Sequence, residues 1–313
     1  MDASSSSSSS SPAPVPDTPP RDAFPRNPGT VEDLHKQCLS LFPMFFEGAK
    51  VLVNKGLNNN FQVSHTMTLS SQQPSGYRFG ATYVGSTMLS PTEAYPLLLA
   101  DMDPSGNLNA NIIHALSHRI RVKCLAQIQQ SKWQSAQITT DYKGDLYTAS
   151  LTLGNPDLIN GTGVMVLHYL RAITRNLSLG SELAYQASPQ LPGGHVAVLA
   201  LAAKYATDDF TLAGTLGNAG SFHASFYQKC SDNLQVGVEM ETNFKMQEST
   251  ASLGYEFDLA KGGFLVRGSV DSNLTVKSVV EKKLLPLPFT LALCSMINHR
   301  KNQFQFGCGL IIG

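Results

Sequence analysis

The last ten residues of the chain alternate between apolar side chains and small or polar ones. The apolar positions are Phe304, Phe306, Cys308, Leu310 and Ile312, and the positions between them are Gln303, Gln305, Gly307, Gly309 and Ile311. Apart from Ile311, this period of two is the pattern of a β-strand with one apolar face. Because the strand runs to the last residue, we expect its outer edge to pair with the first strand and close a barrel.

The same alternation recurs from Gly48 to Gly313, between turn signals rich in Gly, Pro, Asn and Asp. It is clearest in residues 119–129 and 233–245, where apolar and polar residues alternate. If a strand and its turn use about 14 residues, this stretch holds roughly nineteen strands. We therefore predict an all-β fold in which residues 48–313 form a transmembrane β-barrel, with apolar residues outward and polar residues inward.

The N-terminal region has a different character. Residues 1–29 contain an unbroken serine run and many prolines, a composition that predicts a disordered tail. Residues 30–47 are expected to form an amphipathic helix and a linker, with Thr30 and Asp33 as a capping box and Pro43 near the helix end. Its apolar stripe consists of Val31, Leu34, Cys38, Leu41 and Phe42. The helix could line the lumen of a barrel or pack on a soluble sheet, and the barrel pattern favours the lumen.

Composition agrees with a membrane barrel and excludes several other classes. Charged residues make up 15% of the chain, below the usual quarter, and 23 basic residues balance 23 acidic ones, so no nucleic-acid partner is expected. Five scattered cysteines show no disulfide or zinc-finger spacing. There is no signal-peptide pattern and no apolar run of about 20 residues. A membrane barrel without a signal peptide points to the outer membrane of a eukaryotic organelle.

Patterns that would indicate an enzyme are weak. The run from Asp101 to Gly106 imitates the start of a calcium-binding loop, but its twelfth position is Ile112 where a glutamate is required. Gly161-Thr162-Gly163 lacks the third glycine of a dinucleotide-binding turn. The eight histidines show no helical ligand spacing. We therefore expect no catalytic residues, no cofactor and no metal site.

Charged residues gather on the polar faces of predicted strands. A basic row consists of Arg119, Arg121 and Lys123, and an acidic track of Glu239, Glu241, Glu256 and Asp258 spans two consecutive strands. If these faces point inward, the lumen carries separate positive and negative regions, and the acidic one attracts basic amphipathic peptides. The alternative is the solvated outer face of a soluble sheet.

Several ordered blocks of sequence resemble one family, the animal channel-forming subunit of the translocase of the outer mitochondrial membrane. The blocks are Val53–Leu57, Phe79–Gly80, Thr82–Gly85, Leu89–Ala94, Thr152–Pro156, Gly268–Asn273, Glu281–Pro288 and Asn298–Asn302. The resemblance covers nearly everything after Asn27.

This resemblance implies a nineteen-stranded barrel with the N-terminal helix inside the pore, which conducts unfolded precursor proteins across the mitochondrial outer membrane. It also implies as partners the precursors and their presequences, the receptor and small subunits of the translocase, membrane lipids and further copies of the pore. The family carries a sorting signal in its last strand, and here Gln305, Gly307, Leu310 and Ile312 match it.

Two alternatives stay open. An anion-favouring metabolite porin of mitochondria has the same architecture and also nineteen strands, but a basic lumen is expected there. A soluble β-rich protein that binds lipid or another partner is the alternative outside the membrane.

Overall fold

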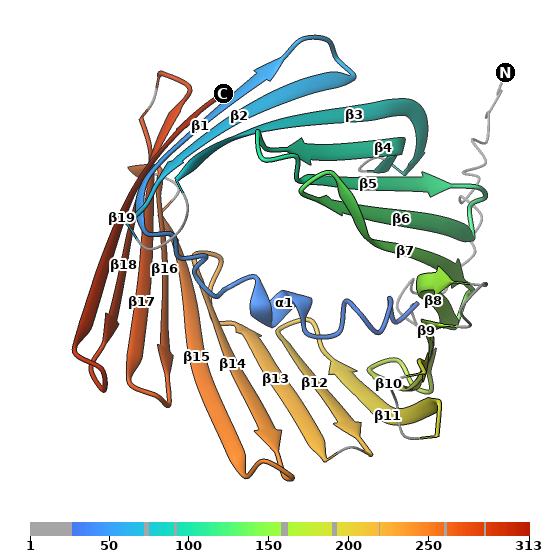
Figure 1. The fold of residues 1–313 in the computed structure, drawn as a ribbon. Coiled ribbons are helices and arrows are strands. Elements are labelled where there is room, and N and C mark those ends of the chain that lie inside the picture. Colours follow the sequence, from blue (N-terminus) through green and yellow to red (C-terminus); the bar gives the residue numbers. More distant parts are fainter. Residues whose placement is uncertain are drawn as a thin grey trace, which may run out of the picture.

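The sheet that dominates this protein has 19 strands and curves around a central space (Figure 1). The computed structural model describes residues 27–71, 75–90, 93–157, 162–189, 193–218, 220–259, 262–284 and 286–313, so the predicted tail lies outside the described residues except for residues 27–29. The first ten strands are β1 Gly48–Gly56, β2 Phe61–Leu69, β3 Gly76–Ser90, β4 Glu93–Met102, β5 Leu108–Ala115, β6 Ile120–Gln129, β7 Lys132–Lys143, β8 Tyr147–Asp157, β9 Thr162–Ala172 and β10 Leu177–Ala187. The other nine are β11 His195–Ala206, β12 Phe210–Gly217, β13 Ser221–Lys229, β14 Leu234–Asn243, β15 Glu248–Leu259, β16 Phe264–Asp271, β17 Thr275–Lys283, β18 Phe289–Asn298 and β19 Gln303–Ile312.

The sheet closes where β19 meets β1, as the sequence predicted. Each strand pairs antiparallel with the next one along the chain. An odd number of such strands brings the first and last ones together parallel, and β1 pairs parallel with β19 from Gly48 opposite Gly307 to Val53 opposite Ile312. We call this β1–β19 pairing the seam. It leaves no strand of the sheet with an unpaired edge, which is the condition for crossing a bilayer.

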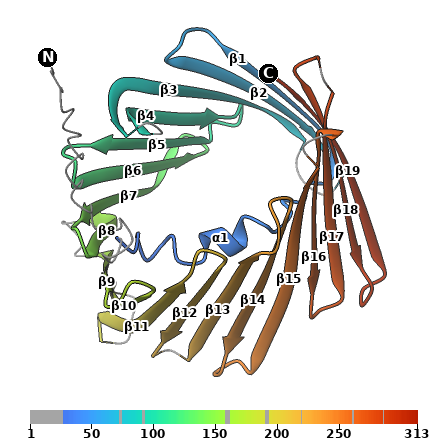
Figure 2. The same cartoon turned by 180° about the vertical axis from the view of Figure 1, so that it is seen from behind.

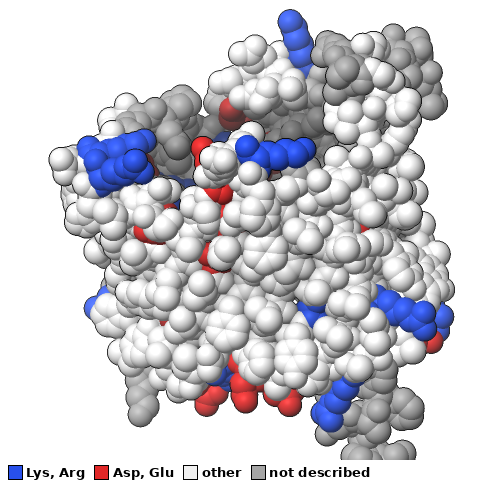
Figure 3. All heavy atoms as spheres, turned by 90° about the horizontal axis from the view of Figure 1, so that it is seen from below, with Lys and Arg blue, Asp and Glu red and all other residues white. Residues whose placement is uncertain are grey.

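The two faces of the wall have opposite character. Many outward side chains are large, apolar and exposed, for example Leu151, Leu167, Leu183, Leu199, Leu212, Val238, Leu253, Leu293 and Phe306. The inner face carries buried polar residues such as Thr152, His168, Ser225, Ser269 and Thr275. One outer face is built mostly of uncharged residues, with charged side chains mainly toward its edges (Figure 3). Outward rings also stack across strands, as in the Tyr147–Tyr169 pair, whose centroids are 5.9 Å apart. An apolar outer band with aromatic residues suits a lipid environment.

No helix in the described part of the chain is both long and apolar enough to cross a membrane.

The N-terminal lumen segment, residues 27–47, lies inside the barrel (Figures 1 and 2). Its α-helix is shorter than expected, because α1 covers only Lys36–Leu39. Before α1 the backbone forms tighter turns, such as the bond from Leu34 N–H to the Val31 carbonyl (3.2 Å). The expected capping pair bonds through its side chains instead, with the Thr30 hydroxyl donating to Asp33 Oδ2 (2.7 Å). Turns of three and of four residues keep the apolar stripe on one side.

That apolar stripe docks on the inner wall. Val31 and Leu34 are buried in a cluster with Leu170, Ala202 and Ala213, on β9, β11 and β12. Further along, Cys38 lies 3.5 Å from the carbonyl oxygens of both Phe226 and Val238. Buried apolar area of this kind stabilises the docked segment.

Glycines on β14 and β15 make room for α1. A Cβ atom at Gly237 would lie 2.9 Å from both Cys38 Sγ and Leu41 Cδ1, and one at Gly254 would lie 3.2 Å from the Phe42 ring. These two glycines are cross-strand partners. They therefore form a flat crossing point where the N-terminal lumen segment, from Cys38 to Phe42, lies directly on the wall. They also show which face of β14 and β15 points inward.

The end of the segment is fixed on β19. The Phe46 carbonyl lies against Gly307 so closely that a Cβ there would overlap it, and a Cβ at Gly309 would lie 2.8 Å from the Phe46 ring. Gly48 then turns the chain into β1 with a φ of +79°, in the left-handed region that favours glycine. The inward glycines of β19 thus act as the seat of Phe46.

Docking of α1 can be tested through the reactivity of Cys38. Burial raises the pKa of the Cys38 thiol to about 11, and the residue is 2% exposed, so it should react slowly with maleimide. With the other four cysteines changed to alanine, we expect Gly237→Val to raise the labelling rate at least about tenfold, because overpacking displaces α1. The control is Gly154→Val. Gly154 points inward on β8, and the nearest atom to a Cβ placed there would be Val164 Cβ, at 3.7 Å. Equal rates in the two variants would refute this docking.

Candidate functional site in the barrel lumen

The four residues of the acidic track all lie on the inner face of β14 and β15. On β14, Glu239 and Glu241 share the face of Gly237, which contacts α1, because alternate residues point the same way. On β15, Glu256 and Asp258 share the face of Gly254 in the same manner. The pairing of Gln235 with Glu256 and of Gly237 with Gly254 joins the two strands in register. The structure therefore places all four carboxylates in the lumen.

These carboxylates differ in how much of their charge is available. Glu239 accepts a hydrogen bond at 2.8 Å from His223 Nε2 when that nitrogen carries the proton, and Glu256 accepts one at 2.7 Å from Arg267 Nε. Glu241 is 64% exposed, and its nearest cationic partner is His223 at 4.0 Å. Asp258 is also exposed. Glu241 and Asp258 are thus the two carboxylates most open to a ligand in the lumen.

The four carboxylates of the acidic track fall into two groups along the wall. The crossing point of the N-terminal lumen segment, at Gly237 and Gly254, lies between the two pairs of acids. Glu239 and Glu256 are four residues apart in register, a separation of about 13 Å along the strands. We therefore describe two acidic patches, an upper patch of Glu239 and Glu241 and a lower patch of Glu256 and Asp258. The names fix no membrane side.

The basic row is largely neutralised by its neighbours. Arg121 and Lys123 approach the same oxygen of Asp141, at 3.1 and 3.2 Å, and the Asp141 side chain is fully buried. Lys123 also lies 3.4 Å from Glu32 of the N-terminal lumen segment. Arg119, just before β6, pairs with Asp145 at 3.2 Å, and both side chains are exposed. The row therefore holds the wall and the segment together more than it offers free positive charge.

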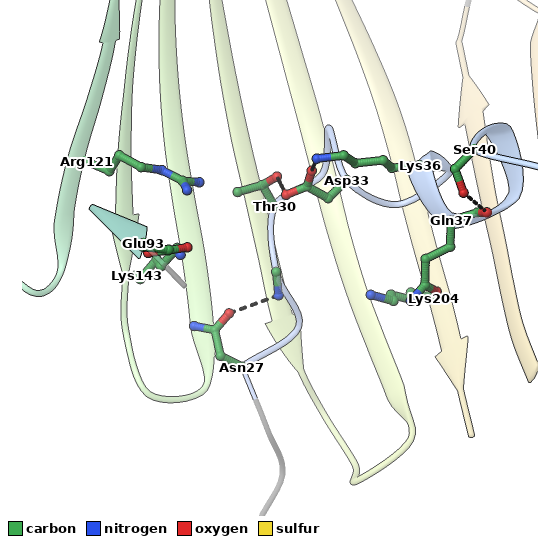
Figure 4. Close-up of a pocket in the computed structure, with 11 residues that line it drawn as sticks. Asn27, Thr30, Asp33, Lys36, Gln37, Ser40, Glu93, Arg121, Lys143 and Lys204 are labelled. Atoms are coloured by element: carbon green, nitrogen blue, oxygen red, sulfur yellow. Dashed lines mark hydrogen bonds and ion pairs between the residues drawn. The ribbon is translucent and has the colours of Figure 1, made fainter. Parts of the chain in front are cut away.

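A cavity of about 790 Å³ separates part of the N-terminal lumen segment from the wall. Figure 4 shows Arg121, Lys143 and Glu93 on the wall side and Asp33 and Lys36 on the segment. Lys204, from β11, also lines the cavity, and its ammonium donates to the Pro28 carbonyl at 3.2 Å. Cations outnumber carboxylates among these lining residues, so the cavity has a basic lining.

Sequence reasoning missed the histidines of the lumen. The rings of His35 and His223 stack with centroids 3.9 Å apart, and His35 Nδ1 lies 2.7 Å from the Ser225 hydroxyl. Burial lowers the pKa of His35 to about 4, and the neighbouring His223 acts in the same direction. His223 also lies directly opposite Glu241. No spacing within one strand reveals such partners, because they become visible only through the strand register.

The residues of the predicted sorting signal lie on both faces of β19. Leu310 and Ile312 share the outward face with Phe304 and Phe306, whereas Gln305 and Gly307 share the inward face with Gly309. Gly307 has a structural duty as well, since it makes room for the Phe46 carbonyl. A substitution at Gly307 therefore changes the seat of Phe46 together with any signal.

Comparison with known proteins agrees with this architecture. Residues 27–307 match the family described as eukaryotic porin. A Drosophila melanogaster protein named mitochondrial import receptor subunit TOM40 homolog 2 is 54% identical over 92% of this chain and 84% of its own length. The Homo sapiens mitochondrial import receptor subunit TOM40 homolog is 52% identical over 92% of this chain and 78% of its own.

A solved structure of a Rh. blastica porin mutant superposes with a TM-score of 0.47 and 13% identity, over 74% of this chain and 96% of that one. The strand pairing itself, rather than this superposition, establishes the closed barrel. Together, the match over most of the barrel and the high identity to the two relatives place the chain in the eukaryotic porin family, among the TOM40 homologs.

Proposed function

We propose that the chain is the protein-conducting channel through which unfolded precursor proteins cross the mitochondrial outer membrane. The observation that carries the proposal is a closed barrel whose lumen holds exposed carboxylates, at Glu241 and Asp258, on either side of α1. Two relatives above 50% identity are named as mitochondrial import receptor subunits, which supports the same function. No step of this function requires covalent chemistry, so the channel acts by binding and by geometry.

The two acidic patches would serve basic presequences in turn. A basic amphipathic peptide is drawn to carboxylates that face a water-filled, low-dielectric channel. Glu239 and Glu256 are held by His223 and Arg267, so they shape the local field, while Glu241 and Asp258 meet the peptide directly. Between the patches the peptide passes α1, whose Cys38 is buried against the wall and whose Leu39 is 47% exposed. An apolar contact there suits the other face of the same amphipathic peptide.

The exposed carboxylates provide the test. We expect the double change Glu241→Gln and Asp258→Asn to weaken binding of a basic presequence peptide at least about threefold at low salt, since each exposed charge contributes modestly. The loss should shrink as salt is added, because salt screens such contacts. Peptide titration of the reconstituted channel measures both effects.

The matched control is Asp208→Asn with Asp209→Asn, which removes the same charge from an exposed turn between β11 and β12. Presequence binding should stay at the level of the unchanged chain in this control. If the lumen variant and the turn variant bind the peptide equally well, the acidic patches are not the presequence site.

We also propose that Gln305, Gly307, Leu310 and Ile312 act as the sorting signal for insertion into the membrane. Leu310 offers the cleaner test, because Gly307 also seats Phe46. Leu310 lies directly opposite Leu291 on β18, on the same face of the wall. Leu310→Asp and Leu291→Asp thus place one charge at the same depth of the outer wall, and only the first alters the signal.

We expect Leu310→Asp to block assembly into isolated mitochondria more strongly than Leu291→Asp, by at least about threefold in assembled barrel. Both variants bear the cost of a charge that faces lipid. Leu310→Asp should lose more assembled barrel because it also impairs recognition of the sorting signal before insertion. Native gel analysis after import measures the assembled fraction. Equal losses in the two variants would mean that the lipid-facing charge alone explains the defect.

The remaining partners follow from the surfaces. We propose that the apolar outer wall contacts lipids, the receptor and small subunits of the translocase, and further copies of this chain. The mass of the complex extracted from mitochondria in mild detergent tests this. A mass equal to the chain alone, with its detergent, would contradict the proposed assembly.

A metabolite porin is the second candidate, and one observation favours it. The cavity lined by Arg121, Lys143 and Lys204 is basic, as expected where small anions bind. The peptide titration separates the two functions. A channel that favours anions and ignores added presequence peptide would support the porin. The soluble alternative is excluded by the closed barrel with its apolar outer wall.

A further inference from the structure

Three side chains able to bind a metal ion meet on the inner face of β13 and β14. His223 lies opposite Glu241 in the strand register, and Glu239 is the next inward residue along β14. One ligand atom from each of the three lies within 4.8 Å of the others. Unlike a group of carboxylates alone, this set includes an imidazole nitrogen, and imidazole nitrogens and carboxylate oxygens are both zinc ligands in proteins.

The distances suit a small divalent cation. His223 Nε2 lies 2.8 Å from Glu239 Oε1 and 4.0 Å from Glu241 Oε1. Zinc ligands at about 2.0–2.1 Å in a tetrahedron lie roughly 3.4 Å from one another. The two observed distances bracket that value, so side-chain rotations alone can bring the three atoms into place. Glu241 is 64% exposed, which leaves it free to rotate and leaves the ion a route from the lumen.

His35 supplies a second, independent observation. Its ring stacks on His223, and its Nδ1 is bonded to Ser225, but its Nε2 is buried with no hydrogen-bond partner among the described residues. A buried nitrogen without a partner destabilises the folded chain, and a water molecule on a bound ion would relieve that cost. The nitrogen without a partner, His35 Nε2, thus lies in a ring that packs directly on His223, one of the three candidate ligands.

We propose that His223, Glu239 and Glu241 bind a divalent cation of the zinc class in the lumen. The imidazole must bind through an unprotonated Nε2, so the proton shared between His223 and Glu239 leaves to solvent on binding. The ion neutralises the upper acidic patch. Resting on the proposed function, this means that zinc weakens the binding of basic presequences.

The chain contains a matched control for this site. His168 and Glu182 form another inward pair of histidine and glutamate, 3.5 Å apart. His168 also has a buried nitrogen, Nδ1, without a partner among the described residues. Among the described residues, this pair has no third metal-ligating side chain close enough to complete a site. Glu182→Gln therefore alters a similar pair without touching the proposed site.

The decisive experiment titrates zinc into the full chain, purified and folded in detergent, with no peptide present. Cys230 and Cys308 are exposed and are changed to serine in every sample, because thiolates bind zinc. We expect one zinc ion per chain, bound at least about tenfold more weakly after Glu241→Gln and with unchanged affinity after Glu182→Gln. Replacing zinc by cobalt adds a spectroscopic check, since nitrogen and oxygen ligands lack the intense thiolate absorption.

Zinc binding that is absent, or equal in the Glu241→Gln variant and the parent, would overturn the proposed site. Folding of the variant is checked by circular dichroism, which separates loss of the barrel from loss of the metal ligand. The peptide is then added with and without zinc. Zinc that binds but leaves peptide affinity unchanged would overturn the link to presequences while the metal site stands. If the parent chain fails to bind the peptide even when no zinc is present, that result would count against the proposed function instead.

Discussion

Closure of the sheet is the constraint on which the rest of this protein depends. In a bilayer no water can satisfy backbone N–H and C=O groups, so every strand edge must have a partner. The seam between β1 and β19 meets that demand. Closure also separates an outer wall that faces lipid from an inner wall that faces water, and it holds the two faces apart over all strands. The lumen, its charges and the docked N-terminal lumen segment exist only because of this separation.

The inner wall carries charge sparingly. Asp141 lies buried between Arg121 and Lys123, and Glu256 is held by Arg267. Lone charges in a narrow, low-dielectric space are costly, and pairing reduces that cost. What remains for a passing ligand is a set of exposed groups, which includes Glu241 and Asp258 of the acidic patches. The N-terminal lumen segment then divides these groups, because it crosses the wall at Gly237 and Gly254.

Sequence periodicity predicted the barrel and its inward faces well, because a period of two depends only on which residues touch lipid. The expected closure by the last strand and the inward placement of the acidic residues, of Arg121 and of Lys123 follow from that rule. The partners of those charges could not be predicted. His223 meets Glu241, and Arg121 meets Asp141, across strands whose relative position depends on each intervening turn. The four-residue α1 was overestimated for a related reason. The apolar stripe predicts which side of the segment docks on the wall. Tight turns keep those residues on one side as well as a longer helix does, so the stripe does not determine the helix length.

The central claim is that precursors cross through the closed lumen and that the seam stays paired while they do. Leu52 and Ile311 are direct partners across the seam and lie outside the sorting signal. Cysteines at these two positions, in a chain without its native ones, can form a disulfide because neighbouring strands place Cα atoms within bonding range. The measurement is the import rate of a presequence-bearing precursor before and after oxidation. The account expects equal rates in both states, whereas import that stops on oxidation and returns on reduction would contradict it.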